Sequence, residues 1–337
     1  MWQNIQGHDT IVERFRRALE RERLAGSFLF TGPPGVGKRR FAFALAMALL
    51  CKHQENLNPC GVCNSCKLFG GRNCTDLNFE TDTFDSPHPD LYYVAKPSDK
   101  SELPLELLIG EKNRRGREGL CYNIARTPFL GHRKVAILND ADFFNDEGAN
   151  ALLKLLEEPP TDAILILIGT ATANQLPTIR SRCQIVRFSP LPPNVLSEIL
   201  VEKGIATSAA LGEKLAAQAE GSLDQAKELA DGDIELLRTE LLKYLTASHW
   251  DAAALATAMN GLIEAVGKET PLRRRRARLI FGLAIEHFRR ELRSAVGTEE
   301  TQLTRRRLER TLDALEHIDR NVNLPLVIEA WSVALGK

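Results

Sequence analysis

The chain has 337 residues, and its 44 basic residues balance 44 acidic ones. A formal net charge of zero excludes bulk attraction to nucleic acid or to a membrane surface, so any such contact must come from a local cluster. No apolar run approaches the roughly 20 residues that cross a bilayer, and the first residues lack the basic and apolar parts of a secretory signal. We therefore expect a soluble, cytoplasmic protein of two or three domains without a membrane partner.

The beginning of the chain predicts a helix, a strand and a second helix. Residues 10–23 place apolar side chains on one helical face, with arginines and glutamates opposite. Residues 27–30 form a short apolar strand, and residues 41–50 are apolar on nearly every side, as expected of a helix buried against a sheet. A glycine-rich loop joins this strand to this helix.

The loop, TGPPGVGKRR, has the composition of a phosphate-binding loop. Its glycines can take backbone angles that let successive N–H groups point at a phosphate, and Lys38 can reach the same oxygens. The usual pattern ends in a serine or threonine whose hydroxyl ligates magnesium, whereas Arg39 is a cation without an acceptor. The loop is therefore predicted to suit phosphate but not metal, at the positions Gly32, Pro33, Pro34, Gly35, Val36, Gly37, Lys38 and Arg39.

Four cysteines follow with the spacing C-x8-C-x2-C-x2-C. Four thiolates at these intervals can close a tetrahedron around zinc, and a full set of protein ligands leaves no open position, so the metal would be structural. The alternative is a loop with unrelated free thiols. The predicted ligands are Cys51, Cys60, Cys63 and Cys66, whereas Cys74, Cys121 and Cys183 are expected to be small buried or half-buried hydrophobic residues.

The sequence patterns over residues 70–126 predict secondary structure less clearly. Residues 70–100 are rich in Asp, Asn, Pro and Ser and predict an irregular surface excursion. His88 could serve there as a further metal ligand, but a histidine in a turn is the simpler interpretation. Residues 106–126 are charged and interrupted by glycines, so a helix there has little support.

Polar side chains follow the next strand, residues 135–138. Asn139, Asp140 and Asp142 come at its C-terminal end, where open α/β sheets gather their ligand sites. Nucleotide hydrolases carry here an aspartate for magnesium and then a glutamate that activates water. Asn139 occupies the first of these positions, and an amide adds no charge to a metal site. Asn139 and Asp140 thus predict a degenerate magnesium site, in agreement with Arg39.

The remaining elements of the first half predict a parallel sheet covered by helices on both faces. A helix over 146–158 ends at two prolines, and apolar strands follow over 163–169 and 185–188. Arg182 lies in a short polar turn, SRC, just before the last of these strands. A lone surface arginine is usually solvated, so the residue pattern alone assigns it no role.

Three prolines in SPLPPN mark a boundary after which every segment is helical in pattern. The segments over 194–230 are short and fit a lid, and the longer helices that follow fit a separate bundle. One basic concentration lies in this bundle and fits either a nucleic-acid surface or a solvated or subunit-contacting helix face. We favour the second interpretation because glutamates intervene and aromatic residues are few. The basic residues are Arg273 to Arg276, Arg278, Arg289, Arg290 and Arg293.

Several of these motifs together resemble the bacterial clamp-loader branch of the AAA+ ATPases, and within it the delta prime family of DNA polymerase III. They are TGPPGVGKRR, the four-cysteine spacing, HPDL, AILNDADFFNDEGANALLKLLEEPP and TIRSRCQ. The resemblance implies an α/β fold with a RecA-like AAA+ parallel sheet and a zinc-binding insertion, followed by a helical lid and an all-α collar. The implied domains are residues 1–189, with the zinc module at about 51–66, then 190–231 and 232–337.

The resemblance also implies a function. The chain would be the stator of a hetero-pentameric ring with tau/gamma and delta subunits, which loads a sliding clamp onto primer–template DNA. Zinc would be structural, and ATP with magnesium would not be hydrolysed by this chain. Arg182 would act as an arginine finger in the ATP site of a neighbouring subunit. Asp224 stands where an active subunit carries a nucleotide-sensing arginine, which is a third departure beside Arg39 and Asn139.

Two other functions stay open at this point. An ATP-hydrolysing motor subunit of the tau/gamma type shares the cysteine spacing and the SRC turn, although Arg39 and Asn139 argue against it. A free-standing, zinc-bearing nucleic-acid-binding protein would also contain the cysteine cluster and the arginine run.

Overall fold

The computed structural model describes residues 5–21, 23–53, 58–69, 88–97, 100, 102–230, 232–247, 249–267, 269–294, 299–320 and 322–336. Cys74 and most of the excursion predicted at 70–100 lie outside these residues. The chain divides into two compact units, residues 1–228 and 229–337, and each is described by itself. The division into three domains, with the lid as a domain of its own, stays a prediction.

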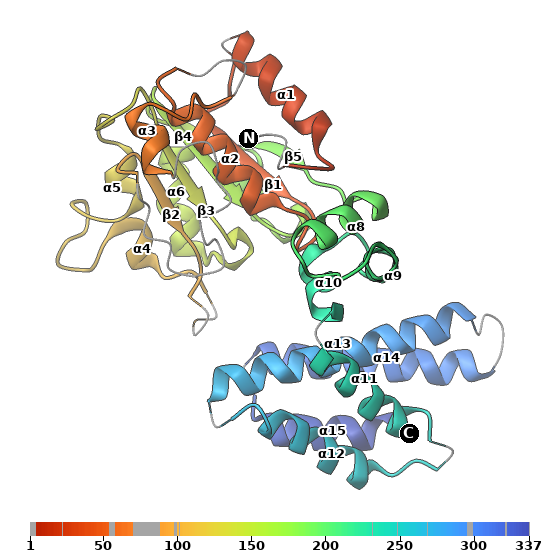
Figure 1. Ribbon diagram of the computed structural model, residues 1–337. Coiled ribbons are helices and arrows are strands. Elements are labelled where there is room, and N and C mark those ends of the chain that lie inside the picture. Colours follow the sequence, from red (N-terminus) through yellow and green to blue (C-terminus); the bar gives the residue numbers. More distant parts are fainter. Residues whose placement is uncertain are drawn as a thin grey trace. The chain divides into compact units, whose positions relative to one another are not determined.

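The first unit is built on a five-stranded parallel sheet with the strand order β2-β3-β4-β1-β5 (Figure 1). Each parallel connection needs a crossover, and the helices in these crossovers cover the sheet. The predicted α/β class with a parallel sheet is therefore confirmed. The strands are β1 (Ser27–Thr31), β2 (Leu91–Val94), β3 (Lys134–Leu138), β4 (Ala163–Ile168) and β5 (Gln184–Arg187).

Helices lie on both faces of this sheet, so β1, β3 and β4 are buried along their whole length. Successive residues of a strand point to opposite faces, and neighbouring residues of β1 accordingly join different cores. Phe30 packs in the cluster that includes α1 and α2, whereas Leu29 packs in the cluster that includes α4, α5 and α6. The helices are α1 (Asp9–Glu20), α2 (Lys38–Leu50), α3 (Asn64–Leu68), α4 (Leu105–Ile109), α5 (Leu120–Ile124), η3 (Ala141–Phe143), α6 (Asp146–Glu157), η4 (Thr172–Asn174), α7 (Pro177–Arg180), α8 (Pro193–Glu202), α9 (Ala209–Gln218) and α10 (Leu223–Ala230).

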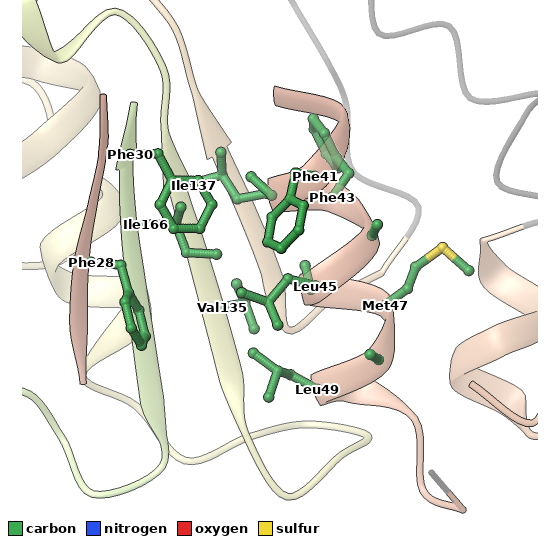
Figure 2. Close-up of a cluster of buried hydrophobic side chains, with 14 of the residues drawn as sticks. Phe28, Phe30, Phe41, Phe43, Leu45, Met47, Leu49, Val135, Ile137 and Ile166 are labelled. Atoms are coloured by element: carbon green, nitrogen blue, oxygen red, sulfur yellow. The ribbon is translucent and has the colours of Figure 1, made fainter. Parts of the chain in front are cut away.

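Helix α2 is buried on every side. Figure 2 shows Phe41 and Leu45 directed at Ile137 and Val135 of the sheet, while Met47 lies on the other side of the helix. Its alternating alanines leave room for neighbours to approach closely, and the predicted all-round burial is confirmed. The helix therefore fixes whatever lies at its two ends.

Two weak sequence patterns differ from the structure. The segment LYYV inside the predicted excursion forms strand β2, because Leu91 to Val94 pair with Val135 to Leu138 of β3. The charged stretch 106–126, in which a helix had little support, contains α5 and all but the first residue of α4. Gly110 and Gly119, with φ of 82° and 86°, take left-handed conformations and lie in contact with each other.

The second unit is a bundle of five helices within its described residues: α11 (Gly232–Leu245), α12 (Ala252–Glu264), α13 (Thr270–Ser294), α14 (Glu299–Asp319) and α15 (Leu324–Leu335). Trp331 is fully buried, 4.5 Å from the ring centroid of Phe281, and its indole nitrogen donates a hydrogen bond to Thr311 Oγ1 at 3.0 Å. Trp250 donates from its indole nitrogen to the Ser332 carbonyl at 3.2 Å. The predicted helical bundle is confirmed. In the described parts of both units, no helix is long and apolar enough to cross a membrane.

Removal of one core ring tests the packing of the first unit. Phe30 is fully buried, and its ring centroid lies 5.2 Å from Phe188 and 5.8 Å from Phe41. Phe30→Ala is expected to lower the free energy of unfolding of this unit by about 3–5 kcal/mol, because lost contacts and a cavity add together. Urea unfolding followed by circular dichroism measures the change.

Phe129→Ala is the matched control for this substitution. The Phe129 side chain is 81% exposed, so its removal should change the free energy of unfolding by less than about 0.5 kcal/mol. Equal effects of the two substitutions would contradict the core described above.

Candidate functional site

The loop 31–39 joins β1 to α2 at the C-terminal edge of the sheet. Gly35 and Gly37 have φ of 72° and 96°, so both take left-handed conformations that favour glycine, and Gly37 is the N-cap of α2. The Lys38 ammonium donates hydrogen bonds to the carbonyls of Gly32 and Pro33, each at 2.6 Å. The predicted loop is thus formed, and its lysine is bonded to the loop's own backbone.

Lys38 lies among acidic side chains although it is buried. Burial lowers the pKa of the Lys38 ammonium to about 8, while the charges of Asp142 and Asp224 act in the opposite direction. Asp142 comes from the loop after β3, and Asp224 comes from the first turn of α10. Two carboxylates therefore act on the cation that would meet a phosphate in a working loop.

Helix α10 begins against the glycine-rich loop. Leu223 donates its backbone N–H to the Gly35 carbonyl at 2.9 Å. A Cβ added at Gly35 would collide with Ser222 Oγ and would lie 2.8 Å from the backbone nitrogen of Asp224. Gly35 is therefore required both for its left-handed backbone and for this close approach.

The edge beside β3 holds the residues predicted as a degenerate magnesium site. Asp140 has φ of 60°, a left-handed conformation that is uncommon for a residue with a side chain. Its carboxylate accepts the Lys96 backbone N–H at 3.3 Å, and Arg39 donates to the Tyr93 hydroxyl at 3.4 Å. Burial raises the pKa of Asp140, and the hydrogen bonds from Lys96 and Asn139 and the charges of Lys96 and Arg39 oppose the shift.

Asp142 has both carboxylate oxygens in hydrogen bonds with the protein. One accepts the Thr170 backbone N–H at 2.7 Å, and the other accepts the side-chain amide of Gln175. These donors follow β4, the neighbour of β3 in the sheet. The side chain therefore joins the ends of two strands.

A cavity of about 250 Å³ adjoins the glycine-rich loop. It lies between the segment before α1, residues 35–37 and helix α8, and its lining includes His8, Arg40 and Glu202. His8 is buried, and its Nε2 atom lies 2.7 Å from the Val36 carbonyl, so the N-terminal segment is tied to the loop. The cavity has both apolar walls and charged side chains.

The four predicted cysteines lie together where α2 ends. All four sulfur atoms lie within 4.8 Å of one another, with Cys51 and Cys63 separated by 3.9 Å and Cys60 and Cys66 by 4.0 Å. A tetrahedral zinc with Zn–S bonds of about 2.3 Å requires sulfur separations of about 3.8 Å, so the arrangement fits such an ion. The cluster could hold a metal such as zinc.

Backbone amides support this cluster. The N–H groups of Cys60, Cys63 and Cys66 point at sulfur atoms of the cluster at 3.2 to 3.5 Å. Such N–H donors favour thiolates, the form that binds metal.

Cys121 and Cys183 lie apart from the cluster, as predicted. Burial raises the pKa of the Cys121 thiol to about 11 and that of the Cys183 thiol to about 12, so both stay protonated and unreactive at neutral pH. His88 is also outside the group of metal-type ligands among the described residues. It lies in a turn, stacked on Phe69 at 5.3 Å, as the simpler interpretation predicted.

Arg182 follows α7 and lies at the surface, with its side chain 31% exposed. Its Nε and Nη2 atoms both donate to one carboxylate oxygen of Glu157, the former at 2.8 Å, and its Nη1 donates to the Thr178 carbonyl at 3.0 Å. Glu157 is the last residue of α6, so this pair joins two helix ends. These hydrogen bonds therefore fix the orientation of the Arg182 guanidinium.

Sequence patterns missed several residues that bond the predicted ones, among them His8, Tyr93, Lys96, Glu157 and Thr178. The acidic pair before the prolines of LLEEPP was the available signal for Glu157. The HPDL motif has a structural explanation, because the fully buried Asp90 accepts three backbone N–H groups, from Phe129, Leu130 and Gly131. It thereby holds the turn that leads into β3.

Comparison with known proteins identifies the family. A family model described as "DNA polymerase III, delta subunit" matches residues 7–192, more than half of the chain. The DNA polymerase III subunit delta' of Pseudomonas aeruginosa is 32% identical over 252 residues, covering 68% of this chain and 67% of that protein. The subunit delta' of Bacillus subtilis is 29% identical, covering 66% of this chain and 59% of that protein.

A tau/gamma subunit is also similar. The DNA polymerase III subunit tau/gamma of Haemophilus influenzae is 30% identical over 238 residues, which cover 69% of this chain but 31% of that protein. The family match over the sheet, together with the delta' relatives, agrees with the glycine-rich loop and the cysteine cluster. The chain therefore belongs to the delta prime family of DNA polymerase III, within the clamp-loader branch of the AAA+ proteins.

Proposed function

We propose that the chain is the stator of a clamp loader. It acts in the cytoplasm, in a hetero-pentameric ring with tau/gamma and delta subunits, and the ring loads a sliding clamp onto primer–template DNA during replication. Residues 1–189 serve as the AAA+ module, 190–231 as the lid and 232–337 as the collar that helps to close the ring. Family membership supports this role, and the relation to a tau/gamma subunit supports the choice of partners.

The proposed stator does not hydrolyse ATP. The observation that carries this part is the charge arrangement at the C-terminal edge of the sheet, where a protein cation takes the place of a metal ligand. Arg39 replaces the hydroxyl that would ligate magnesium, and its charge acts on the half-buried Asp140. Asn139 adds no negative charge to the site. A divalent ion would therefore meet a cation and an amide at the positions of its usual ligands.

The phosphate side of the loop supports the same conclusion. Lys38 is bonded to two loop carbonyls, and Asp224 faces it from α10. A triphosphate would approach this carboxylate, and like charges at close range repel. The loop then serves to join β1, α2 and α10 rather than to carry out chemistry.

Arg182 is proposed to act in trans, on the ATP site of a neighbouring motor subunit. A guanidinium can stabilise the charge that develops on a transferred phosphoryl group. The pair with Glu157 orients the side chain while leaving it at the surface. Because an exposed ion pair is worth only about 0–1 kcal/mol, exchanging Glu157 for a phosphate would cost little.

Zinc is proposed as the metal of the cysteine cluster. The sulfur separations and the four-thiolate ligand set support zinc, and the absence of an open ligand position makes the ion structural. Bound zinc would hold residues 51–66 on the end of α2.

Purified full-length chain is expected to show no magnesium-dependent ATP hydrolysis above that of the Lys38→Ala variant. The reason is the arrangement of Arg39 and Asn139, which lacks the ligands for magnesium. Steady-state phosphate release, measured with excess magnesium and with chelator, tests this expectation. Steady turnover that Lys38→Ala abolishes would instead support the tau/gamma-type motor function.

In a reconstituted ring with tau/gamma and delta subunits, Arg182→Ala is expected to leave assembly intact. Hydrolysis at the adjacent motor site should slow at least about a hundredfold, because the developing phosphoryl charge loses its guanidinium. In single-turnover measurements, the ATP bound at this site should be hydrolysed as a separate, slow fraction of the total. Arg180→Ala removes another exposed arginine two residues away and is the matched control. Unchanged hydrolysis kinetics in both variants would refute the role of Arg182 as an arginine finger.

Freshly purified protein is expected to contain about one zinc ion per chain. Cys60→Ser should reduce the zinc content well below this value and lower the melting temperature, because three thiolates hold the ion more weakly. Elemental analysis and thermal unfolding measure the two effects. Cys121→Ser, which removes a thiol outside the cluster, should retain the metal. Zinc content that is low in the unaltered chain, or equal in the two variants, would reject the site.

A further inference from the structure

Helix α13 presents a nearly uniform cationic face to solvent. Its residues from 272 to 293, all of whose side chains are described, include seven exposed residues. Two of them are Leu272 and Gly282, and the other five are Arg275, Arg278, Arg289, Arg290 and Arg293. The protein is neutral overall, so this concentration is a local property of one helix.

Helix geometry aligns these arginines. With 3.6 residues per turn, Arg275, Arg278, Arg289 and Arg293 fall within a sector of about 60°, and Arg290 lies about 60° beyond its edge. At a rise of 1.5 Å per residue, the row from Arg275 to Arg293 is about 27 Å long. We call these five exposed arginines the arginine face.

Of the two glutamates that interrupt the arginines in the sequence, only Glu286 pairs with a member of this face, Arg290. Glu286 is 29% exposed, and its carboxylate oxygens are bonded by Arg238 of α11 at 3.3 Å and by Arg290 at 2.9 Å. Glu291 points to the other side of the helix, where it lies 3.2 Å from His287. Both carboxylates are therefore engaged by cationic or titratable neighbours within the unit.

One arginine of the sequence run belongs to the fold instead. Arg274 is half-buried and donates hydrogen bonds to the carbonyls of Ile318 at 2.9 Å and Val322 at 3.2 Å. It thus satisfies carbonyl groups at the C-terminus of α14, where a cation is also favoured by the helix dipole. Within the run Arg273 to Arg276, Arg274 therefore has a structural role, whereas Arg275 belongs to the arginine face.

Gly282 lies in the middle of the arginine face. A Cβ added to it would meet no atom within 4 Å, so no packing contact in the unit requires a glycine. Glycine inside a helix costs about 1 kcal/mol relative to alanine. A flat position between two groups of arginines allows a partner's backbone to approach the helix closely.

We propose that the arginine face binds the phosphate backbone of double-stranded DNA without regard to base sequence. A row of cations about 27 Å long matches a polyanion that carries one charge per about 1.7 Å of its axis. A protein partner fits less well, because it would have to present a row of carboxylates opposite the arginines, and Asp and Glu are depleted at protein–protein interfaces. This contact is independent of the proposals for the nucleotide loop and for Arg182.

The test uses the full-length chain and a fluorescent 20-base-pair duplex of arbitrary sequence. Binding is followed by anisotropy over a series of salt concentrations. Neutralisation of each phosphate contributes about −0.9 to the slope of log K against log salt. The variant R275A/R289A/R293A is therefore expected to have a slope shallower by about 2.7 and an affinity at least about tenfold lower at low salt.

The matched control is R305A/R306A/R310A on α14, which removes the same charge. There Arg305 pairs with Glu309 at 2.9 Å and Arg310 with Asp313 at 4.0 Å, so signs alternate along the helix. This control should retain the slope of the unaltered chain, and tryptophan fluorescence checks that both variants remain folded. Equal slopes for the two variants, or no duplex binding by the unaltered chain, would overturn the proposal. If R275A/R289A/R293A lost ring assembly but kept its DNA binding, the arginine face would be a subunit contact, and the DNA-binding proposal would be overturned as well.

Discussion

Burial of α2 on all sides is the constraint on which the first unit depends. The helix lies between the sheet and its neighbours, so neither rotation nor translation is free. Its N-terminus fixes the glycine-rich loop and its C-terminus fixes the cysteine cluster, about 20 Å away along thirteen residues. One buried helix thus positions both features that the sequence marks as functional. A metal in the cluster would stabilise the same element that carries the loop.

The edge of the sheet beside the loop is balanced by charges of the protein itself. The cations are Lys38, Arg39 and Lys96, and the anions that act on them or on which they act are Asp140, Asp142 and Asp224. Lys38, Arg39, Asp140 and Asp142 hydrogen bond within the chain, and the donors to Asp142 come from the segment that follows β4. A charge-balanced edge does not need a metal ion to be stable, which suits a subunit whose proposed task is to hold a fixed shape.

Local sequence patterns were sufficient to predict the elements that depend only on residues adjacent in the sequence. Buried parallel strands read as continuous apolar runs, and metal spacing is a property of a few adjacent residues, so β1, β3, β4 and the cysteine cluster were predictable. Strand β2 was not, because four residues in polar surroundings become a strand only through pairing with β3. The contact of Arg182 with Glu157 spans 25 positions and has no local signature. On α13, Glu291 stands among arginines in the sequence but lies on the other side of the helix, next to His287.

The two tryptophans in the bundle allow its unfolding to be followed by fluorescence. Trp250 and Trp331 hydrogen bond inside the second unit, whereas the described residues of the first unit contain no tryptophan. The sequence has a third tryptophan, Trp2, so in a Trp2→Phe variant the ultraviolet emission comes from these two indoles and follows the bundle, while far-ultraviolet dichroism follows both units. Since chains with two units need not unfold in one step, comparing the two signals would give separate stabilities without cutting the chain. In that variant the bundle serves as an internal reference for the unit that holds the loop.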